Sequence, residues 1–133
     1  MPSQPPALTM WHDVLRNRDP SSLADLLAPD AVFHSPVMHR PQAGRDLVTV
    51  YLTGAMHVLA NDSFTYVREV VGEHDAVLEF TATVDDIHVN GVDMITWNDD
   101  GRITDFKVML RPKKAIDLVQ QRMAELLAAT QTP

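Results

Sequence analysis

The chain has 133 residues, no cysteine, and 18 Asp and Glu side chains against 11 Lys and Arg. This length suits one domain, large enough to bury a hydrophobic core without a disulfide or a metal. The lack of cysteine excludes thiol catalysis, redox chemistry at a CxxC motif and cysteine-ligated zinc. A net charge of -7 would repel a phosphate backbone, so we expect no nucleic-acid partner.

The N-terminal sequence MPSQPP lacks the basic and apolar segments of a signal peptide. Since no apolar run reaches the roughly 18 residues of a membrane helix, we expect a cytoplasmic protein without membrane contact. We divide the chain into a disordered N-terminus at residues 1–6, a domain at residues 7–111, and a C-terminal helix at residues 112–130 that packs on the same domain.

The first half of the chain has mainly helical periodicity. Apolar residues recur at helical spacing from Leu8 to Leu15, and Asp19-Pro20 indicates the N-cap and first residue of a second, short helix. A third helix is predicted at residues 44–60. Between the second and third helices, residues 31–33 are predicted to form a short strand.

From residue 64 the apolar period changes to two. Four strands are predicted, at residues 64–71, 76–84, 87–97 and 103–110, and their short connections imply an antiparallel meander. A last amphipathic helix follows Pro112. Helices followed by a long curled meander predict an α+β fold, in which a cone-shaped antiparallel sheet wraps around the N-terminal helices.

Asp93 interrupts an apolar, strand-forming run at residues 91–97. An unpaired carboxylate is costly to bury, and strand alternation places Asp93 on the same face as Ile95 and Trp97, pointing into a core or a pocket. A carboxylic acid kept neutral there can donate a hydrogen bond to a ligand carbonyl or oxyanion. The alternative is a structural carboxylate bonded to Trp11, to a histidine or to the backbone.

The concave face of the cone is predicted to be lined by Leu78, Phe80, Ala82, Asp93, Ile95, Trp97, Phe106, Val108 and Leu110. Trp11 and Tyr51 reach this face from the helices. These side chains form either an apolar ligand cavity or an ordinary core.

His34 is the best candidate for a general base, because imidazole exchanges protons near neutral pH. Strand alternation places His34 and Ser35 on opposite faces, so only one of them points inward, and His34 is alternatively a surface residue. His12 is expected to lie in solvent beside the buried stripe of the first helix. The other histidines are too scattered in sequence to predict a metal site.

The convex face of the sheet is predicted to carry Val92, Met94 and Thr96 beside Lys107 and Met109. Such a face is more apolar than a monomer usually leaves exposed, which predicts a homodimer through the sheet face. The apolar side of the C-terminal helix then covers either the mouth of the cone or a partner subunit.

The order of elements, the sequence LLAPDAVFHSPV at residues 26–37, Pro41, Gly44 and the sequence GRI at residues 101–103 resemble the nuclear-transport-factor-2-like superfamily, with its SnoaL-like and ketosteroid-isomerase-like domains. The resemblance covers about residues 7–111 and implies the cone fold and a homodimer. It places Asp93 on the protonated aspartic acid of the isomerase oxyanion hole and Trp11 on the tyrosine donor. Ser35 takes the place of the isomerase base.

Two other branches of the superfamily also resemble the chain. The epoxide hydrolase residues fall on Ala82, Phe80 and Val108, and the acid/base aspartate of the polyketide cyclases falls on Lys107. None of the three mechanisms therefore carries over unchanged.

We accordingly expect the cone to bind a small, largely apolar metabolite that carries a carbonyl or hydroxyl group, without an organic cofactor or a metal. Asp93 would act as acid or hydrogen-bond donor and His34 as base, in isomerase, cyclase or hydrolase-like chemistry. The expected ligand contacts are Trp11, Ser35, Tyr51, Phe80, Trp97, Phe106 and Val108. The alternative is a noncatalytic binding or dimerisation module with a structural Asp93.

Overall fold

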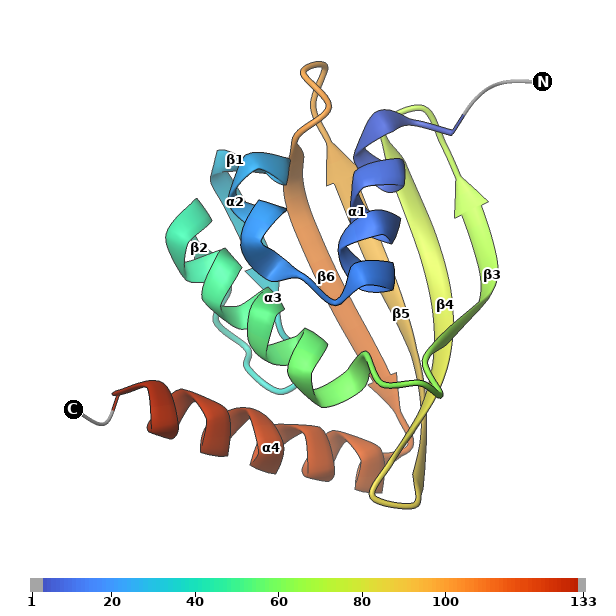
Figure 1. The fold of residues 1–133 in the computed structure, drawn as a ribbon, viewed down its shortest axis with the longest axis vertical. Coiled ribbons are helices and arrows are strands. Elements are labelled where there is room, and N and C mark those ends of the chain that lie inside the picture. The colour runs from blue at the N-terminus through green and yellow to red at the C-terminus, as the bar shows by residue number, and fades with distance from the viewer. Residues whose placement is uncertain (1–3, 132–133) are drawn as a thin grey trace.

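One six-stranded sheet forms the framework of the computed structural model, which describes residues 4–131 (Figure 1). The strands lie in the order β2-β1-β6-β5-β4-β3. Every neighbouring pair is antiparallel except β1 and β6, which are parallel. The strands are β1 (Leu27–His34), β2 (Gln42–Ala43), β3 (Thr65–Val71), β4 (Asp75–Val84), β5 (Ile87–Trp97) and β6 (Ile103–Arg111).

The helices are α1 (Pro6–Asn17), the single turn α2 (Leu23–Leu26) with the preceding 3-10 turn η1 (Pro20–Ser22), α3 (Arg45–Leu59) and α4 (Lys113–Gln131). α1 and α3 lie across one face of the curved sheet, and α4 runs below α3 at the end of the sheet where β4 turns into β5 (Figure 1). The predicted α+β cone with an extra C-terminal helix is confirmed. No helix within residues 4–131 is long and apolar enough to cross a membrane.

β1 is longer than the strand predicted at residues 31–33, and it pairs with the additional short strand β2. β1 begins at Leu27, which pairs with Ile103 of β6, and the register then shifts before Val32. Pro29 lies within this irregular stretch, as expected for a residue that cannot donate a hydrogen bond to a neighbouring strand.

The β4–β5 hairpin fixes the register around Asp93. Asp85 and Asp86 both have positive φ, 49° and 66°, which suits the two-residue turns that match the twist of paired strands. The resulting register places Leu78 opposite Asp93 and Phe80 opposite Gly91. The residues predicted to line the concave face are buried, apart from the partly buried Leu110.

α4 packs on its own chain. Ala115 and Val119 are buried, and Arg122 forms an ion pair with Asp85 at the β4–β5 turn. Of the N-terminal residues predicted to be disordered, 1–3 lie outside the described residues. Gln4 accepts a side-chain hydrogen bond from Thr9 at the start of α1.

Candidate ligand site

A chain of hydrogen bonds links α1, β3 and β5. Nε1 of Trp11 donates to the hydroxyl of Tyr66 over 2.9 Å, and that hydroxyl donates to Oδ2 of Asp93 over 2.5 Å. Asp93 is only 6% exposed. Buried carboxylates require such partners, so the position identified from the sequence is both buried and partnered.

Burial raises the pKa of Asp93 to about 7, although the hydrogen bond from Tyr66 acts in the opposite direction. Burial likewise raises the pKa of the Tyr66 phenol well above its usual range, and the nearby charge of Asp93 raises it further. Asp93 therefore exchanges its proton near neutral pH, while Tyr66 keeps its own. The site can supply a neutral carboxylic acid at physiological pH.

Asp93 lines a narrow inner cavity with a volume of about 30 Å³. Its walls are apolar and include Leu52, Met56, Leu59 and Phe64. A water molecule needs a cavity of roughly 10–15 Å³, so the inner cavity has room for about two waters and not for a metabolite.

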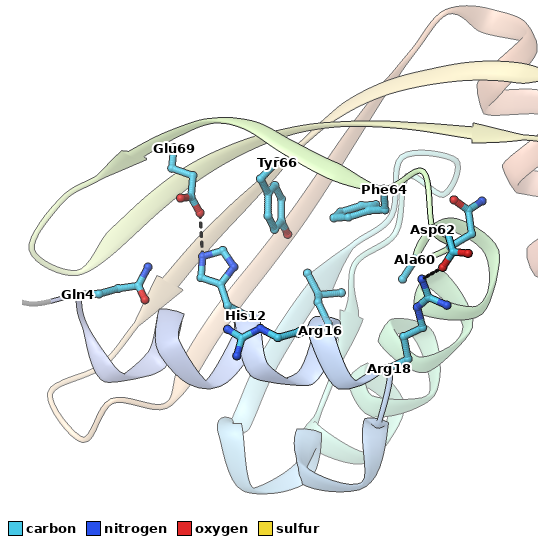
Figure 2. A pocket seen from close by; sticks show the side chains of 11 residues that line it. Gln4, His12, Arg16, Arg18, Ala60, Asp62, Phe64, Tyr66 and Glu69 are labelled. Atoms are coloured by element: carbon cyan, nitrogen blue, oxygen red, sulfur yellow. Dashed lines mark hydrogen bonds and ion pairs between the residues drawn. The ribbon is translucent and has the colours of Figure 1, made fainter.

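A much larger outer pocket, of about 520 Å³, lies between α1 and β3 (Figure 2). Small-molecule sites typically measure about 300–1,000 Å³, so this pocket has the size that the inner cavity lacks. Leu15, Ala60 and Phe64 line both spaces and separate them. Tyr66 lines the outer pocket and, through its bond to Asp93, connects it to the inner cavity.

His12 lies in this outer pocket and not in solvent, which corrects the expectation from the sequence. Its side chain is only 20% exposed, and Nε2 lies 2.7 Å from Oε1 of Glu69 on β3. The contact has the distance of an ion pair without the geometry of a hydrogen bond. The His12 ring meets the Tyr66 ring edge-on, with centroids 5.5 Å apart. Helical periodicity predicts that His12 lies beside the buried stripe of α1. That β3 covers His12 is seen only in the folded structure.

Four predicted ligand contacts line the inner cavity beside Asp93, namely Trp11, Phe80, Phe106 and Val108. Tyr51 and Trp97 do not line it. The ring of Tyr51 stacks on Phe33 with centroids 6.1 Å apart, and Trp97 is buried in the core.

His34 and Ser35 border a separate pocket of about 360 Å³. Nε2 of His34 lies 3.0 Å from Oδ2 of Asp105, and Oγ of Ser35 accepts a hydrogen bond from the backbone N–H of Val37. Because the buried Phe33 occupies the concave face, alternation turns His34 to the opposite face of the sheet. The structure therefore does not bring His34 to Asp93, although Val108 borders both spaces.

Within residues 4–131, no three histidine or carboxylate side chains lie close enough together to hold a metal ion.

A curved sheet wrapped around helices is the architecture of the nuclear-transport-factor-2-like class of domains, and this chain has it. Within that class the chain belongs to the SnoaL-like domain family, whose model matches residues 8–106.

Solved structures agree with this assignment. A steroid delta-isomerase from Pseudomonas aeruginosa is 40% identical, with a TM-score of 0.89, over 93% of this chain and 90% of that one. An uncharacterised protein with a cystatin-like fold from Silicibacter pomeroyi is 31% identical, with a TM-score of 0.87, over 94% of this chain and 87% of that one. A putative polyketide cyclase from Sinorhizobium meliloti shares the fold at 18% identity and a TM-score of 0.65, over 80% and 95%. A search of curated proteins finds no match.

Proposed function

We propose that the protein binds a small, largely apolar metabolite through a carbonyl or hydroxyl oxygen and performs cofactor-independent isomerase- or cyclase-type acid/base chemistry on it. The observation that carries this proposal is the buried chain from Trp11 through Tyr66 to Asp93, which connects the outer pocket to a carboxylic acid. The ligand's body would occupy the outer pocket, because the inner cavity is too small for it.

The hydrogen-bond chain suits an oxygen on which negative charge develops. A phenolic oxygen can accept two hydrogen bonds and donate one. When Asp93 is neutral, its carboxyl group can donate a hydrogen bond to the Tyr66 hydroxyl, which also accepts one from Trp11. The proton of the Tyr66 hydroxyl is then free to bond the ligand oxygen. Donors fixed in a buried site before reaction stabilise an enolate without reorganisation. The likeness to a protein named as a steroid delta-isomerase supports an apolar, steroid-like molecule as the substrate class, and the donors at Tyr66 suit a ketone oxygen on it.

The rival function is a noncatalytic binding or dimerisation module in which Asp93 is structural. The size of the inner cavity, about 30 Å³, and the existing bond between Tyr66 and Asp93 favour it. Under this alternative, Asp93→Leu would retain or increase stability, since a well-packed apolar side chain can replace a buried polar network.

Binding of β-naphthol, a phenol whose oxygen resembles an enolate oxygen, tests the proposal. Tyr66→Phe should weaken binding about tenfold or more, because a charge-assisted hydrogen bond contributes about 1.5–3 kcal/mol. Asp75→Asn, at an exposed position of β4, serves as the matched polar control. Unchanged affinity in Tyr66→Phe would contradict the proposal.

Turnover is tested with a β,γ-unsaturated ketone, such as the corresponding isomer of cyclohexenone or of androstenedione. Formation of the conjugated ketone is followed by ultraviolet absorbance. Asp93→Asn should abolish turnover and retain the fold, because an amide has the shape of a carboxylic acid without its acidity. An Asp93→Asn protein that converts the ketone as the wild type does would remove Asp93 from the mechanism.

We further propose a homodimer through the convex sheet face. The proposal is supported by the exposure of apolar side chains on four adjacent strands, Val70, Val77, Met94 and Met109 among them. Met109→Glu should shift sedimentation toward a monomer, and Met38→Glu, at an equally apolar but separate exposed position, should not.

A further inference from the structure

We propose that His12, positioned by Glu69, is the general base of this site and moves a proton between two carbons of the ligand. This inference rests on the proposed function, since it needs a ligand oxygen held at Tyr66. It assigns proton transfer to a helix residue for which the sequence predicted only a solvent-exposed position.

The first argument is the orientation of the imidazole. Nε2 of His12 lies 2.7 Å from the carboxylate of Glu69, and Figure 2 shows the other ring nitrogen, Nδ1, on the side of the ring away from Glu69. A carboxylate beside Nε2 favours the tautomer with the proton on that nitrogen, which leaves the lone pair on Nδ1. Nε2 is buried beside Glu69 and has no hydrogen-bond partner, and no hydrogen bond to Nδ1 forms among the described residues.

The second argument is the neighbourhood of the ring. His12 and Tyr66 line the same outer pocket, and their rings are in edge-on contact with centroids 5.5 Å apart. A ketone whose oxygen is bonded to the Tyr66 hydroxyl would therefore place its neighbouring carbons within reach of His12. Base and oxyanion donor act together only when they face one ligand in this way.

The third argument comes from the other histidine pairs. His34 with Asp105 and His74 with Asp99 also form histidine–carboxylate contacts, at 3.0 Å and 2.9 Å. His74 is half exposed in a turn, and His34 borders a different pocket. Among the pairs in the described part of the chain, only that of His12 lines the pocket that contains Tyr66.

The step balances without a co-reactant. Nδ1 takes the proton from the α-carbon of the ketone, and the electrons of that C–H bond form the carbon–carbon double bond of an enolate. The carbonyl π electrons move to oxygen, where the Tyr66 hydroxyl donates its hydrogen bond. The imidazolium then gives the proton to the γ-carbon, where the electrons of the β,γ double bond form the new C–H bond. The electrons of the enolate double bond move to the α,β position, the electrons on oxygen restore the carbonyl, and the product is the conjugated ketone.

Deuterium exchange at the α-carbon of the same β,γ-unsaturated ketone in D₂O, followed by NMR, tests this step directly. His12→Ala should slow the exchange about 100-fold or more, the usual contribution of a general base. β-Naphthol binding should be retained, because Tyr66 and Asp93 are untouched. His74→Ala, which breaks an exposed histidine–carboxylate pair, should leave exchange unchanged.

Added imidazole distinguishes chemistry from structure. It should restore exchange in His12→Ala by filling the vacated space with the missing base, which would not repair a merely distorted pocket. Glu69→Gln should lower the exchange rate at saturating ketone without changing the ketone concentration that gives half the maximal rate, as expected for a positioning residue.

Two results would overturn the inference and leave the proposed function standing. In the first, the wild type binds β-naphthol through Tyr66 and exchanges deuterium, but His12→Ala exchanges equally fast. In the second, exchange is lost in His34→Ala and kept in His12→Ala. Failure of the wild type to bind β-naphthol would instead reject the proposed function, and this inference with it.

Discussion

The hydroxyl of Tyr66 lies 2.5 Å from Oδ2 of Asp93, although the two residues belong to strands that are not neighbours. β4 lies between them: Tyr66 pairs with Phe80, and Phe80 pairs with Gly91. The phenol therefore reaches over Phe80 to a carboxylate on the next strand. The stability of the fold, the pKa of Asp93 and the access of a ligand to the site all depend on this hydrogen bond across β4.

The first prediction concerns stability against pH. Asp93 has a folded pKa of about 7, whereas an unfolded aspartic acid has one of about 3.9. The neutral acid therefore stabilises the folded state fully at pH values below the unfolded pKa. This stabilisation is lost as the pH rises through the folded pKa. The two pKa values differ by roughly three pH units, and each unit corresponds to about 1.4 kcal/mol. The free energy of unfolding should therefore fall by something on the order of 4 kcal/mol over this range.

Urea denaturation between about pH 4 and about pH 7 measures this change, since the free energy of unfolding should fall less steeply with pH in Asp93→Asn than in the wild type. Asp75→Asn, with an exposed carboxyl group, corrects for the general effect of one fewer acid. Parallel pH curves for the wild type and Asp93→Asn would show that Asp93 does not carry a raised pKa.

The second prediction concerns Tyr66→Phe, which deprives Asp93 of its donor and Trp11 of its acceptor. Leaving buried polar groups unpaired should cost about 1–3 kcal/mol at neutral pH. The pKa of Asp93 should rise further, because its hydrogen bond to Tyr66 lowers it. Tyr51→Phe is the control, because the Tyr51 hydroxyl has no hydrogen bond among the described residues. Equal urea midpoints for the two variants would show that the hydrogen bonds of the Tyr66 hydroxyl to Trp11 and Asp93 do not stabilise the fold.

Much of this arrangement is predictable from local sequence patterns. The period change near residue 64 predicts the order of helices and strands, and the alternation at residues 91–97 predicts the inward position of Asp93. Both features depend on short-range spacing. Trp11 is predicted beside Asp93 through its place on the buried stripe of the first helix.

Tyr66 could not be predicted in the same way, because its position depends on a register irregularity. The pairing of β3 with β4 shifts between Tyr66 and Arg68, so simple alternation does not assign the face of the tyrosine. His34 presents a related difficulty. Alternation leaves two orientations open, and the position of Phe33 in the core decides between them. The partner of His12, Glu69, is set by long-range packing alone.

The third prediction concerns Gly91, whose missing side chain makes room for Phe80. A Cβ at this position would lie 2.6 Å from Cζ of Phe80 and 2.7 Å from the carbonyl oxygen of Met109. Because a backbone oxygen cannot move away cheaply, Gly91→Ala should destabilise the fold by about 1–3 kcal/mol. Gly54→Ala, where the nearest atom is the flexible end of Met123, is the matched control. Thermal melts that move equally for both would refute the packing argument.

The last prediction concerns Phe64, which borders both the outer pocket and the inner cavity. Its ring stacks on Phe80 at 4.9 Å and meets Tyr66 edge-on at 5.1 Å, so it lies beside the route from the outer pocket to Asp93. Phe64→Leu removes the flat ring that separates the two spaces and keeps an apolar side chain. β-Naphthol should then associate faster with the protein, as measured by stopped-flow fluorescence. Phe33→Leu makes the same change at a buried ring that lines neither space, and it should lower stability without faster association. If Phe64→Leu associates no faster than the wild type, the ring of Phe64 does not limit access of the ligand oxygen to the Tyr66 hydroxyl, which bonds Asp93.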